Sequence, residues 1–548
     1  SRTIPTAVAL ALFLLWITPG LLDRDLWKAD EPYSFGLVHH IVETGDWVIP
    51  TIAGQPFMEK PPLFYLTAAG FVRLFSSWIE PHDAARLASA LFMLLTTVFM
   101  GLAARELMGE KAAGMTIVLL VGSTGLQVTS HKLITDLALL TGIAAALYGF
   151  TLFLRRPALG GFWIGTGTGI GFMSKGLIAP GLTALLALAL PLVNAEWRNR
   201  SYARSMLIAL IASLPWLAVW PTVLYLRSPD LFVEWFWYQN IGRYFGFANV
   251  GRGFTPAFYL EQLPWYALPS LPIALWAVWR ERRAWRERPE LYVPLTAFLV
   301  MLTVFSLSTG MRNIYALPML LPLALLAAGG LETLPERLGA AFNRISLVLF
   351  GSLAAIVWLS WIIDMTDTPS FAAQRLHRFE AHPAHAFNKF LFAAACVYSA
   401  AWIITVLRSR LLKHNFLFNW TMGTVLVWGL LMTLWLPSLD AASGYRPLFT
   451  ALREKIPAGC RSVITEGLGE SERALVDYYV NVTPRPLEGN GPWDCDMLLL
   501  ESGKVTNYPP PGPDWRLVWQ GRRPGDTPNR SKEIYTLFRR EGGRKQCL

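Results

Sequence analysis

The side chains with the clearest chemical potential are carboxylates and cations in polar stretches between long apolar segments. A first group runs from Asp30-Glu31-Pro32 to Glu59-Lys60-Pro61-Pro62. A second group is spread over later stretches and comprises Asp136, Lys175, Arg243, Arg312 and Tyr315. Charged side chains at membrane depth are costly and usually mark a function. These residues are therefore the candidates for a functional site.

Cations that meet beside an apolar region suit the phosphate of a lipid. The candidate hydrogen-bond donors to such a phosphate are Lys60, Lys175, Arg243 and Arg312, and arginine can bind phosphate through two parallel hydrogen bonds. If the lipid carries a sugar, transfer of the sugar makes the phosphate the leaving group. Fixed cations then stabilise the charge that grows on it. Nearby carboxylates can hold sugar hydroxyls or an amine, position an acceptor, or bind a divalent cation.

Each candidate also has a purely structural explanation. Asp30 can cap a helix, and Glu59 can form a local ion pair with Lys60 ahead of a helix that begins at the two prolines. The remaining cations can extend to the interface and contact lipid headgroups. Their shared placement on one side of the predicted membrane favours function.

The composition limits the class of protein. The chain has 548 residues, of which 53% are hydrophobic and only 16% are charged, whereas a soluble globular protein carries roughly 25% charged residues. This excludes an intrinsically disordered chain, a disulfide-dense secreted domain and a single soluble domain, and it indicates an integral membrane protein. The net charge of +10 fits basic cytoplasmic loops, so we expect no nucleic-acid partner.

About 13 transmembrane helices are predicted, since each crossing needs about 20 apolar residues. They are placed at 4–22, 83–104, 112–129, 133–153, 159–174, 177–193, 205–226, 257–279, 291–308, 313–331, 345–364, 387–407 and 418–437. The short loops on one side, such as 280–288, carry more Lys and Arg than those opposite, which predicts that this side is cytoplasmic. The glycine run from Gly165 to Gly171 lies inside a span with no strand before it, so we interpret it as helix packing, not nucleotide binding.

The candidate residues then lie on the outer side. There the long first loop, 23–82, has helical apolar spacing at 31–44 and 61–78, which predicts helices at the membrane surface. The segment 227–256 is interpreted as a loop. We divide the chain into a membrane domain, 1–440, and an outer α/β domain, 441–548.

The outer domain should contain two helices and four strands. Helices are predicted at 446–456 and 469–480, and strands at 461–466, 496–501, 515–520 and 533–539. Three cysteines lie here, namely Cys460, Cys495 and Cys547. They could form disulfides in an oxidising compartment, and the sequence leaves their connectivity open.

The first-loop motifs resemble those of a known family. Asp30-Glu31-Pro32, Gly45-Asp46-Trp47 and Phe57-x-Glu59-Lys60-Pro61-Pro62 are similar to the bacterial lipid A aminoarabinose transferases, which are GT-C membrane glycosyltransferases related to the protein O-mannosyltransferases. The resemblance implies a polytopic α-helical membrane protein with a periplasmic C-terminal α/β domain. Tyr33 departs from the motif, because Arg is expected at this position.

This resemblance implies transfer of 4-amino-4-deoxy-L-arabinose from undecaprenyl phosphate to a phosphate of lipid A on the periplasmic face of the inner membrane. The new amine would lower the negative charge of lipid A and weaken the binding of polymyxin and other cationic peptides. No cofactor is required, although a divalent metal on Glu59 is an option. The implied roles are as follows: Asp30 orients donor or acceptor, Lys60 binds the donor phosphate with support from Lys175 and Arg243, Glu59 and Asp136 contact sugar or metal, and Tyr315 lines the donor pocket.

Two other hypotheses remain open. A polyprenyl-phosphate-sugar transferase acting on protein or another glycan would need Asp30 as a true general base, because a hydroxyl acceptor must lose its proton. A lipid transporter or flippase, which performs no chemistry, predicts polar residues along the whole path across the membrane. The polar residues here gather at one face, which disfavours transport.

Overall fold

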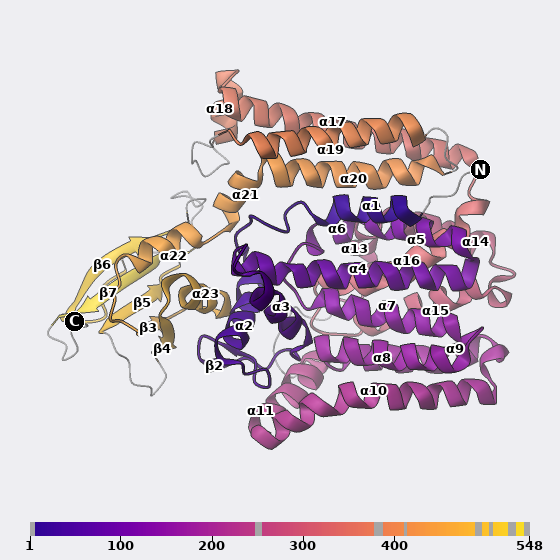
Figure 1. Ribbon diagram of the computed structural model, residues 1–548, viewed down its shortest axis with the longest axis horizontal. Coiled ribbons are helices and arrows are strands. Elements are labelled where there is room, and N and C mark those ends of the chain that lie inside the picture. Colours follow the sequence, from indigo (N-terminus) through magenta and orange to yellow (C-terminus); the bar gives the residue numbers. More distant parts are fainter. Residues whose placement is uncertain are drawn as a thin grey trace.

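The computed structural model describes residues 6–246, 255–377, 387–409, 414–487, 496–503, 508–523 and 533–541. Its long helices lie side by side, and a small β-sheet projects from one end of the helical body (Figure 1). Two first-loop helices, α2 (Asp30–Thr44) and α3 (Leu63–Phe75), lie at that same end, next to the sheet. These are the two helices that the first-loop spacing predicts.

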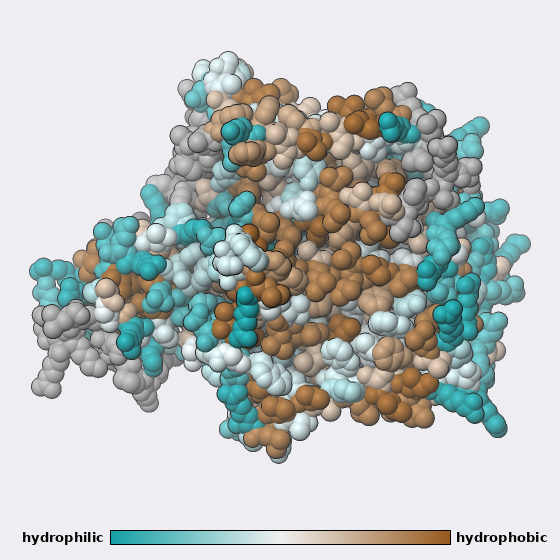
Figure 2. Space-filling model, in the orientation of Figure 1, coloured by the Kyte–Doolittle hydropathy of each residue, from teal (hydrophilic) through white to brown (hydrophobic). Residues whose placement is uncertain are grey.

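Eight helices in the described residues are long and apolar enough to cross a membrane. They are α4 (Pro81–Met108), α7 (Asp136–Phe153), α10 (Arg200–Arg227), α15 (Pro289–Ser306), α16 with its flanking turns (Asn313–Thr333), α17 (Glu336–Thr366), α19 (Lys389–Ser409) and α20 (Asn415–Leu434). Three further helices fall on predicted spans, namely α1 (Thr6–Ile17), α8 (Pro157–Lys175) and α9 (Ile178–Val193). Figure 2 shows the resulting apolar band between two polar ends. The chain is a polytopic helical membrane protein, as predicted.

Two predicted spans are each broken into two helices. The span at 112–129 is α5 (Glu110–Val121) and α6 (Thr124–Thr129), and the span at 257–279 is α13 (Phe258–Tyr266) and α14 (Ser270–Arg280). Proline explains the second break, because Pro269 has no N–H and restricts the residue before it. The breaks meet: the Thr124 N–H donates to the Leu268 carbonyl at 3.1 Å. Irregular backbone is thus satisfied inside protein, as membrane depth requires.

The glycine run packs helices together. A side chain at Gly165 or Gly161 on α8 would collide with the backbone of α10, and one at Gly167 would collide with α7. Helix α8 therefore sits close to both neighbours, which agrees with the interpretation of this run as helix packing.

The segment 229–245 is helical, so its interpretation as a loop is wrong over these residues. It contains α11 (Pro229–Val233), a π-helix η2 (Glu234–Gly242) and α12 (Arg243–Phe245). The wider turn of a π-helix breaks the 3.6-residue periodicity that marks an ordinary helix. Residues 247–254 of the predicted loop lie outside the described residues.

The C-terminal sheet has five strands in the order β4-β3-β5-β7-β6. Strands β3 (Ser462–Glu466), β4 (Thr483–Pro486) and β5 (Met497–Glu501) are parallel to one another. Strand β7 (Tyr535–Arg540) pairs antiparallel with β5 on one side and with β6 (Trp515–Gly521) on the other. The four predicted strands are present, but β4 was not predicted because it contains two prolines. Both are tolerated because β4 is an edge strand.

The helices of this C-terminal region are α21 (Leu436–Ser443), α22 (Arg446–Arg453), α23 (Glu470–Leu475) and the π-helix η6 (Val476–Val480). The helices predicted at 446–456 and 469–480 correspond to α22 and to α23 with η6. Cys460 is disulfide-bonded. Cys495 and Cys547 lie outside the described residues.

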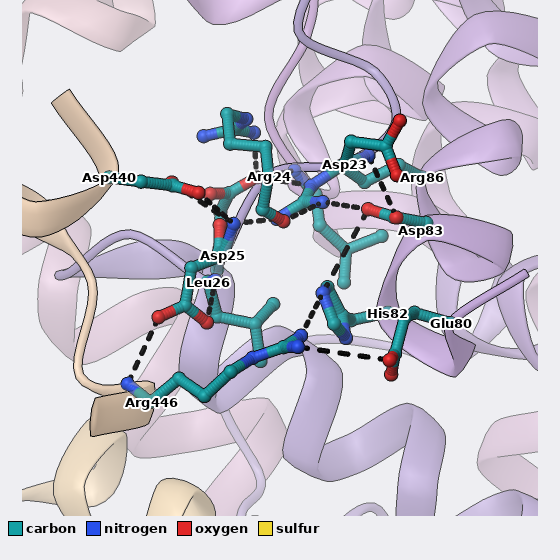
Figure 3. Close-up of polar contacts among 12 residues, drawn as sticks. Asp23, Arg24, Asp25, Leu26, Glu80, His82, Asp83, Arg86, Asp440 and Arg446 are labelled. Carbon is teal, nitrogen blue, oxygen red and sulfur yellow. Dashed lines mark hydrogen bonds and ion pairs between the residues drawn. The ribbon is translucent and has the colours of Figure 1, made fainter. Parts of the chain in front are cut away.

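A buried arginine of α4 organises the start of the first loop. Arg86 donates from Nη1 to Asp83 Oδ1 at 2.6 Å and to the Arg24 carbonyl at 2.7 Å, and from Nη2 to the Asp25 carbonyl at 2.6 Å (Figure 3). Its side chain is fully buried. The loop backbone is thus held at the N-terminal end of α4.

Asp25 links the start of the first loop to the C-terminal region through hydrogen bonds. Its N–H donates to Asp440 Oδ1 at 3.1 Å, while its own Oδ2 accepts from the N–H groups of Tyr445 and Arg446 at 3.1 and 3.0 Å. Asp25 therefore satisfies the free N–H groups at the start of α22 from more than 400 residues away in sequence. Figure 3 shows these segments converging.

Glu31, within the motif Asp30-Glu31-Pro32, completes the buried network. Its Oε1 accepts from Arg24 Nη2 at 2.6 Å and from Arg86 Nε at 3.2 Å. The Leu133 N–H also donates to Oε1, at 3.1 Å. Burial alone would raise the pKa of Glu31, but the two guanidinium groups outweigh it and lower the pKa to about 2. Glu31 is therefore an ionised structural anchor.

We expect Glu31→Ala to destabilise the protein by about 3–5 kcal/mol, because it leaves two buried guanidinium groups without their carboxylate. Thermal unfolding of the purified protein in detergent measures this. Glu43→Ala is the matched control, since Glu43 lies exposed on the same helix. Equal unfolding temperatures for the two variants would contradict the assigned anchor.

Candidate active site

A cavity of about 390 Å³ opens beside the first loop. One wall is apolar and includes Ile178, Leu182 and Leu185 of α9 together with Val304 of α15. Its polar lining residues come from four separate parts of the chain and are Glu59, Lys60, Lys175, Gln239, Asn240, Arg243, Tyr244, Ser308, Arg312 and Tyr315. The cavity therefore combines an apolar surface with a concentration of charge.

The first-loop contribution is Glu59-Lys60, placed by a two-stranded hairpin and by two prolines. Strands β1 (Thr51–Ile52) and β2 (Gln55–Pro56) pair antiparallel, and the Phe57 N–H then donates to the Pro50 carbonyl at 2.7 Å. Pro61 and Pro62 follow, directly before α3 begins. The short connection leaves Glu59 and Lys60 little freedom to move away from the cavity.

Glu59 lies between two cations. Lys60 Nζ is 3.7 Å from Glu59 Oε1, and Arg243 Nη1 forms a close ion pair with the same oxygen. Burial would raise the pKa of Glu59, but Lys60 and Arg243 lower it to about 2. For Lys60 the effects are reversed: burial would lower its pKa, but the Glu59 carboxylate holds the pKa well above its ordinary value. Both groups are therefore ionised at neutral pH.

Asp136 and Lys175 form a second ion pair. Asp136 begins α7, Lys175 ends α8, and the two side chains are in direct contact. The Lys175 ammonium also lies 4.2 Å from the centre of the Tyr315 ring, a cation–π distance. Asp136 does not line the cavity, so it acts on the cavity through Lys175.

Asp30 is linked to the cavity by two routes. Arg312 Nη2 lies 3.2 Å from Asp30 Oδ1, and the Tyr33 hydroxyl donates to the same oxygen at 3.3 Å. Lys60 Nζ in turn donates to the Tyr33 hydroxyl at 2.7 Å. Tyr33 thus connects Asp30 with Lys60.

The predicted site residues converge in space. Six of them line the cavity, namely Glu59, Lys60, Lys175, Arg243, Arg312 and Tyr315. The other two, Asp30 and Asp136, contact Arg312 and Lys175. Each of the four cations has a carboxylate partner. Four positive and three negative side chains leave a net charge of +1.

The option of a metal on Glu59 is not supported in the described part of the chain. No group of three or more His, Cys, Asp or Glu side chains there could hold an ion. The near neighbours of Glu59 are the cations Lys60 and Arg243, which would repel a metal ion.

Sequence reasoning missed two contributors. Tyr33 was noted only as a departure, yet it bridges Asp30 and Lys60. Asn240 of η2 accepts from the Leu177 N–H at 3.0 Å and donates to the Trp235 carbonyl at 2.8 Å, which joins the start of α9 to the segment that carries Arg243. No sequence signal identifies Asn240, because its partners are backbone groups.

Comparison with known proteins gives this architecture a class. The family described as dolichyl-phosphate-mannose-protein mannosyltransferase matches residues 59–220. The solved structure of ArnT from Cupriavidus metallidurans bound to undecaprenyl phosphate superposes with a TM-score of 0.70 over 97% of each chain, at 18% sequence identity. The chain therefore shares the fold of that protein.

Curated relatives at higher identity define the family. The undecaprenyl phosphate-alpha-4-amino-4-deoxy-L-arabinose arabinosyl transferase of Serratia proteamaculans is 29% identical over 65% of this chain and 64% of its own length. The enzyme of the same name from Aeromonas salmonicida is 30% identical over 70% of this chain and 69% of its own length. The chain belongs to this arabinosyl transferase family, and it spans about two thirds of the length of these curated relatives.

We expect Gly181→Leu to weaken binding of a polyprenyl phosphate by about tenfold or more, because the new side chain would fill the apolar part of the cavity. A Cβ at Gly181 meets nothing within 4 Å, so the helix itself should tolerate the change. Tryptophan fluorescence or microscale thermophoresis measures the affinity. Gly70→Leu is the control, since Gly70 is exposed on α3 and equally unobstructed. Equal affinities for the two variants would contradict the expectation that the polyprenyl chain lies in the apolar part of the cavity.

Proposed function

We propose that this protein transfers 4-amino-4-deoxy-L-arabinose from undecaprenyl phosphate to a phosphate group of lipid A. The relatives named for this donor support the sugar and its carrier. We further propose that the reaction takes place on the periplasmic face of the bacterial inner membrane. The added amine would reduce the negative charge of lipid A and so reduce its affinity for polymyxin and other cationic peptides.

One observation carries the proposal. Lys60, Lys175, Arg243 and Arg312 line one cavity that also has an apolar wall, formed by the short apolar helix α9 and by α15, a candidate membrane span. An isoprenoid chain fits the apolar wall, and a phosphate needs the cations. Neither a soluble nucleotide sugar nor a simple neutral lipid would use both halves.

The cations serve the leaving group. An oxygen of the acceptor phosphate attacks the anomeric carbon, the bond from that carbon to the donor phosphate oxygen breaks, and its electron pair stays on undecaprenyl phosphate. Negative charge on that oxygen grows during the step, so fixed cations bind the transition state more tightly than the donor. Lys60 is the proposed principal contact, with Lys175 and Arg243 in support. Asp136 keeps Lys175 oriented.

Asp30 has a different task in this scheme. An acceptor phosphate is already anionic at neutral pH and needs no strong base. We assign Asp30, with its partner Arg312, to orienting the donor sugar or the incoming acceptor. Arg312 can offer a second phosphate contact once it leaves Asp30, because its side chain is about half exposed.

A second candidate is transfer to a protein hydroxyl, which the match of residues 59–220 to a protein mannosyltransferase family favours. In that reaction Asp30 would accept the hydroxyl proton. The two candidates differ in acceptor, so a single assay that offers lipid A and a peptide pool separates them.

The deciding experiment uses the purified protein, undecaprenyl phosphate-linked aminoarabinose and lipid A, with mass spectrometry of the product. We expect lipid A to gain the mass of one aminopentose residue, which is the sugar less one water. Lys60→Ala should lower kcat by about 10²–10³-fold, the usual effect of removing one preorganised donor to a developing anion.

Lys111→Ala is the matched control, because Lys111 is exposed and far from the cavity in sequence. Full transfer by Lys60→Ala would contradict the site. Modified peptide with unmodified lipid A would favour the second candidate.

A further inference from the structure

The backbone that leads into Asp30 is held by the C-terminal domain. Lys28 lies two residues before Asp30, and its ammonium makes ion pairs with Glu472 of α23 and, at 2.6 Å, with Glu533 just before β7. Lys28 is 30% exposed and Glu472 only 4% exposed, so this contact is largely shielded from water. Burial would lower the pKa of Lys28, but the hydrogen bonds to Glu472 and Glu533 raise it.

Glu533 is itself fixed. Its Oε2 accepts from the Tyr445 hydroxyl at 2.6 Å and from the Tyr535 hydroxyl at 3.2 Å. Both tyrosine side chains are fully buried. The carboxylate that holds Lys28 is therefore itself held by two buried tyrosine side chains of the domain.

Helix α23 makes a second contact with the same backbone. The Ser471 hydroxyl donates to the carbonyl of Ala29 at 2.6 Å, and Ala29 immediately precedes Asp30. About two turns further along α2, a Cβ at Gly36 would lie 2.7 Å from the Cβ of Ala474, so α2 and α23 approach as closely as glycine permits.

The neighbouring residue of α23 reaches the other catalytic segment. Arg473 hydrogen-bonds to Gln55 on β2, and β2 leads through Phe57 to Glu59-Lys60. The short helix α23 of the C-terminal domain thus contacts both first-loop segments that approach the cavity, the one that ends at Asp30 and the one that leads to Glu59-Lys60.

We propose that Lys28, gripped by Glu472 and Glu533, is a positioning residue for Asp30, and that the C-terminal domain sets the geometry of the first-loop half of the active site. This inference rests on the proposed function for the role of Asp30. Shifts of about 1 Å in a catalytic group can cost two orders of magnitude in rate, so a contact two residues away is close enough to matter.

The contacts around the cavity predict that loss of the Lys28 ion pairs lowers kcat without a matching change in KM for the donor. The proposed donor-phosphate contacts Lys60, Lys175 and Arg243 form ion pairs with Glu59 and Asp136, and none of these ion pairs involves Lys28. Loss of the Lys28 contact should therefore leave donor binding intact while it lowers the rate of transfer.

The test compares Lys28→Met, Lys28→Arg and Lys455→Ala in the full-length protein. Lys28→Met keeps a long side chain without charge, Lys28→Arg keeps the charge, and Lys455 is an exposed lysine of the C-terminal domain. We expect Lys28→Met to lower kcat by about tenfold or more, with KM for the donor within about twofold of wild type. Lys28→Arg should recover most of the rate, and Lys455→Ala should equal wild type.

Hydrogen–deuterium exchange gives a readout that needs no activity. Lys28→Met should speed amide exchange in the peptide that covers 28–36 but not in peptides of the sheet. An unchanged kcat in Lys28→Met would overturn the proposal, and so would a rate loss that Lys28→Arg fails to repair. If the wild-type protein transfers no aminoarabinose, the proposed function fails. Amide exchange in the peptide 28–36 then decides the positioning claim. An amide exchange rate in Lys28→Met that equals the wild-type rate overturns it.

Discussion

The buried contact between Glu31 and the guanidinium groups of Arg24 and Arg86 is the constraint on which the first loop and the cavity beside it depend. It takes three charges out of water, and such a group is stable only when every member is paired. The same arginines also satisfy backbone carbonyls of residues 20, 24 and 25. The first loop therefore has one fixed starting point, from which α2 projects Asp30 toward the cavity.

Charge balance at the cavity follows the same logic. Lysines and arginines that await a phosphate would be costly to bury alone, and Glu59, Asp136 and Asp30 hold them ionised and ordered beforehand. The carboxylates also compete with the ligand. In the proposed reaction, the surplus of one positive charge would favour a donor with a single phosphodiester charge.

Much of the architecture could be predicted because it rests on local patterns. Apolar length located the membrane helices, and short strand-like runs located β3, β5, β6 and β7. The convergence of Lys60, Lys175, Arg243 and Arg312 followed from their placement on one predicted side of the membrane. The pairings did not follow, since the partner of each ion depends on tertiary contacts. Asp136, assigned to sugar or metal, is bound to Lys175, and Glu31 is an anchor and not part of the cavity.

The joining of Asp25 and Ala29 to residues 440–475 has a consequence for biosynthesis. Ribosomes make the first loop early, whereas Asp440, Tyr445 and Ser471 emerge hundreds of codons later. Until those late residues have been made and folded, the early loop lacks these contacts. A nascent chain whose helices are already inserted would thus remain catalytically silent, and competence would arrive only near the completion of synthesis.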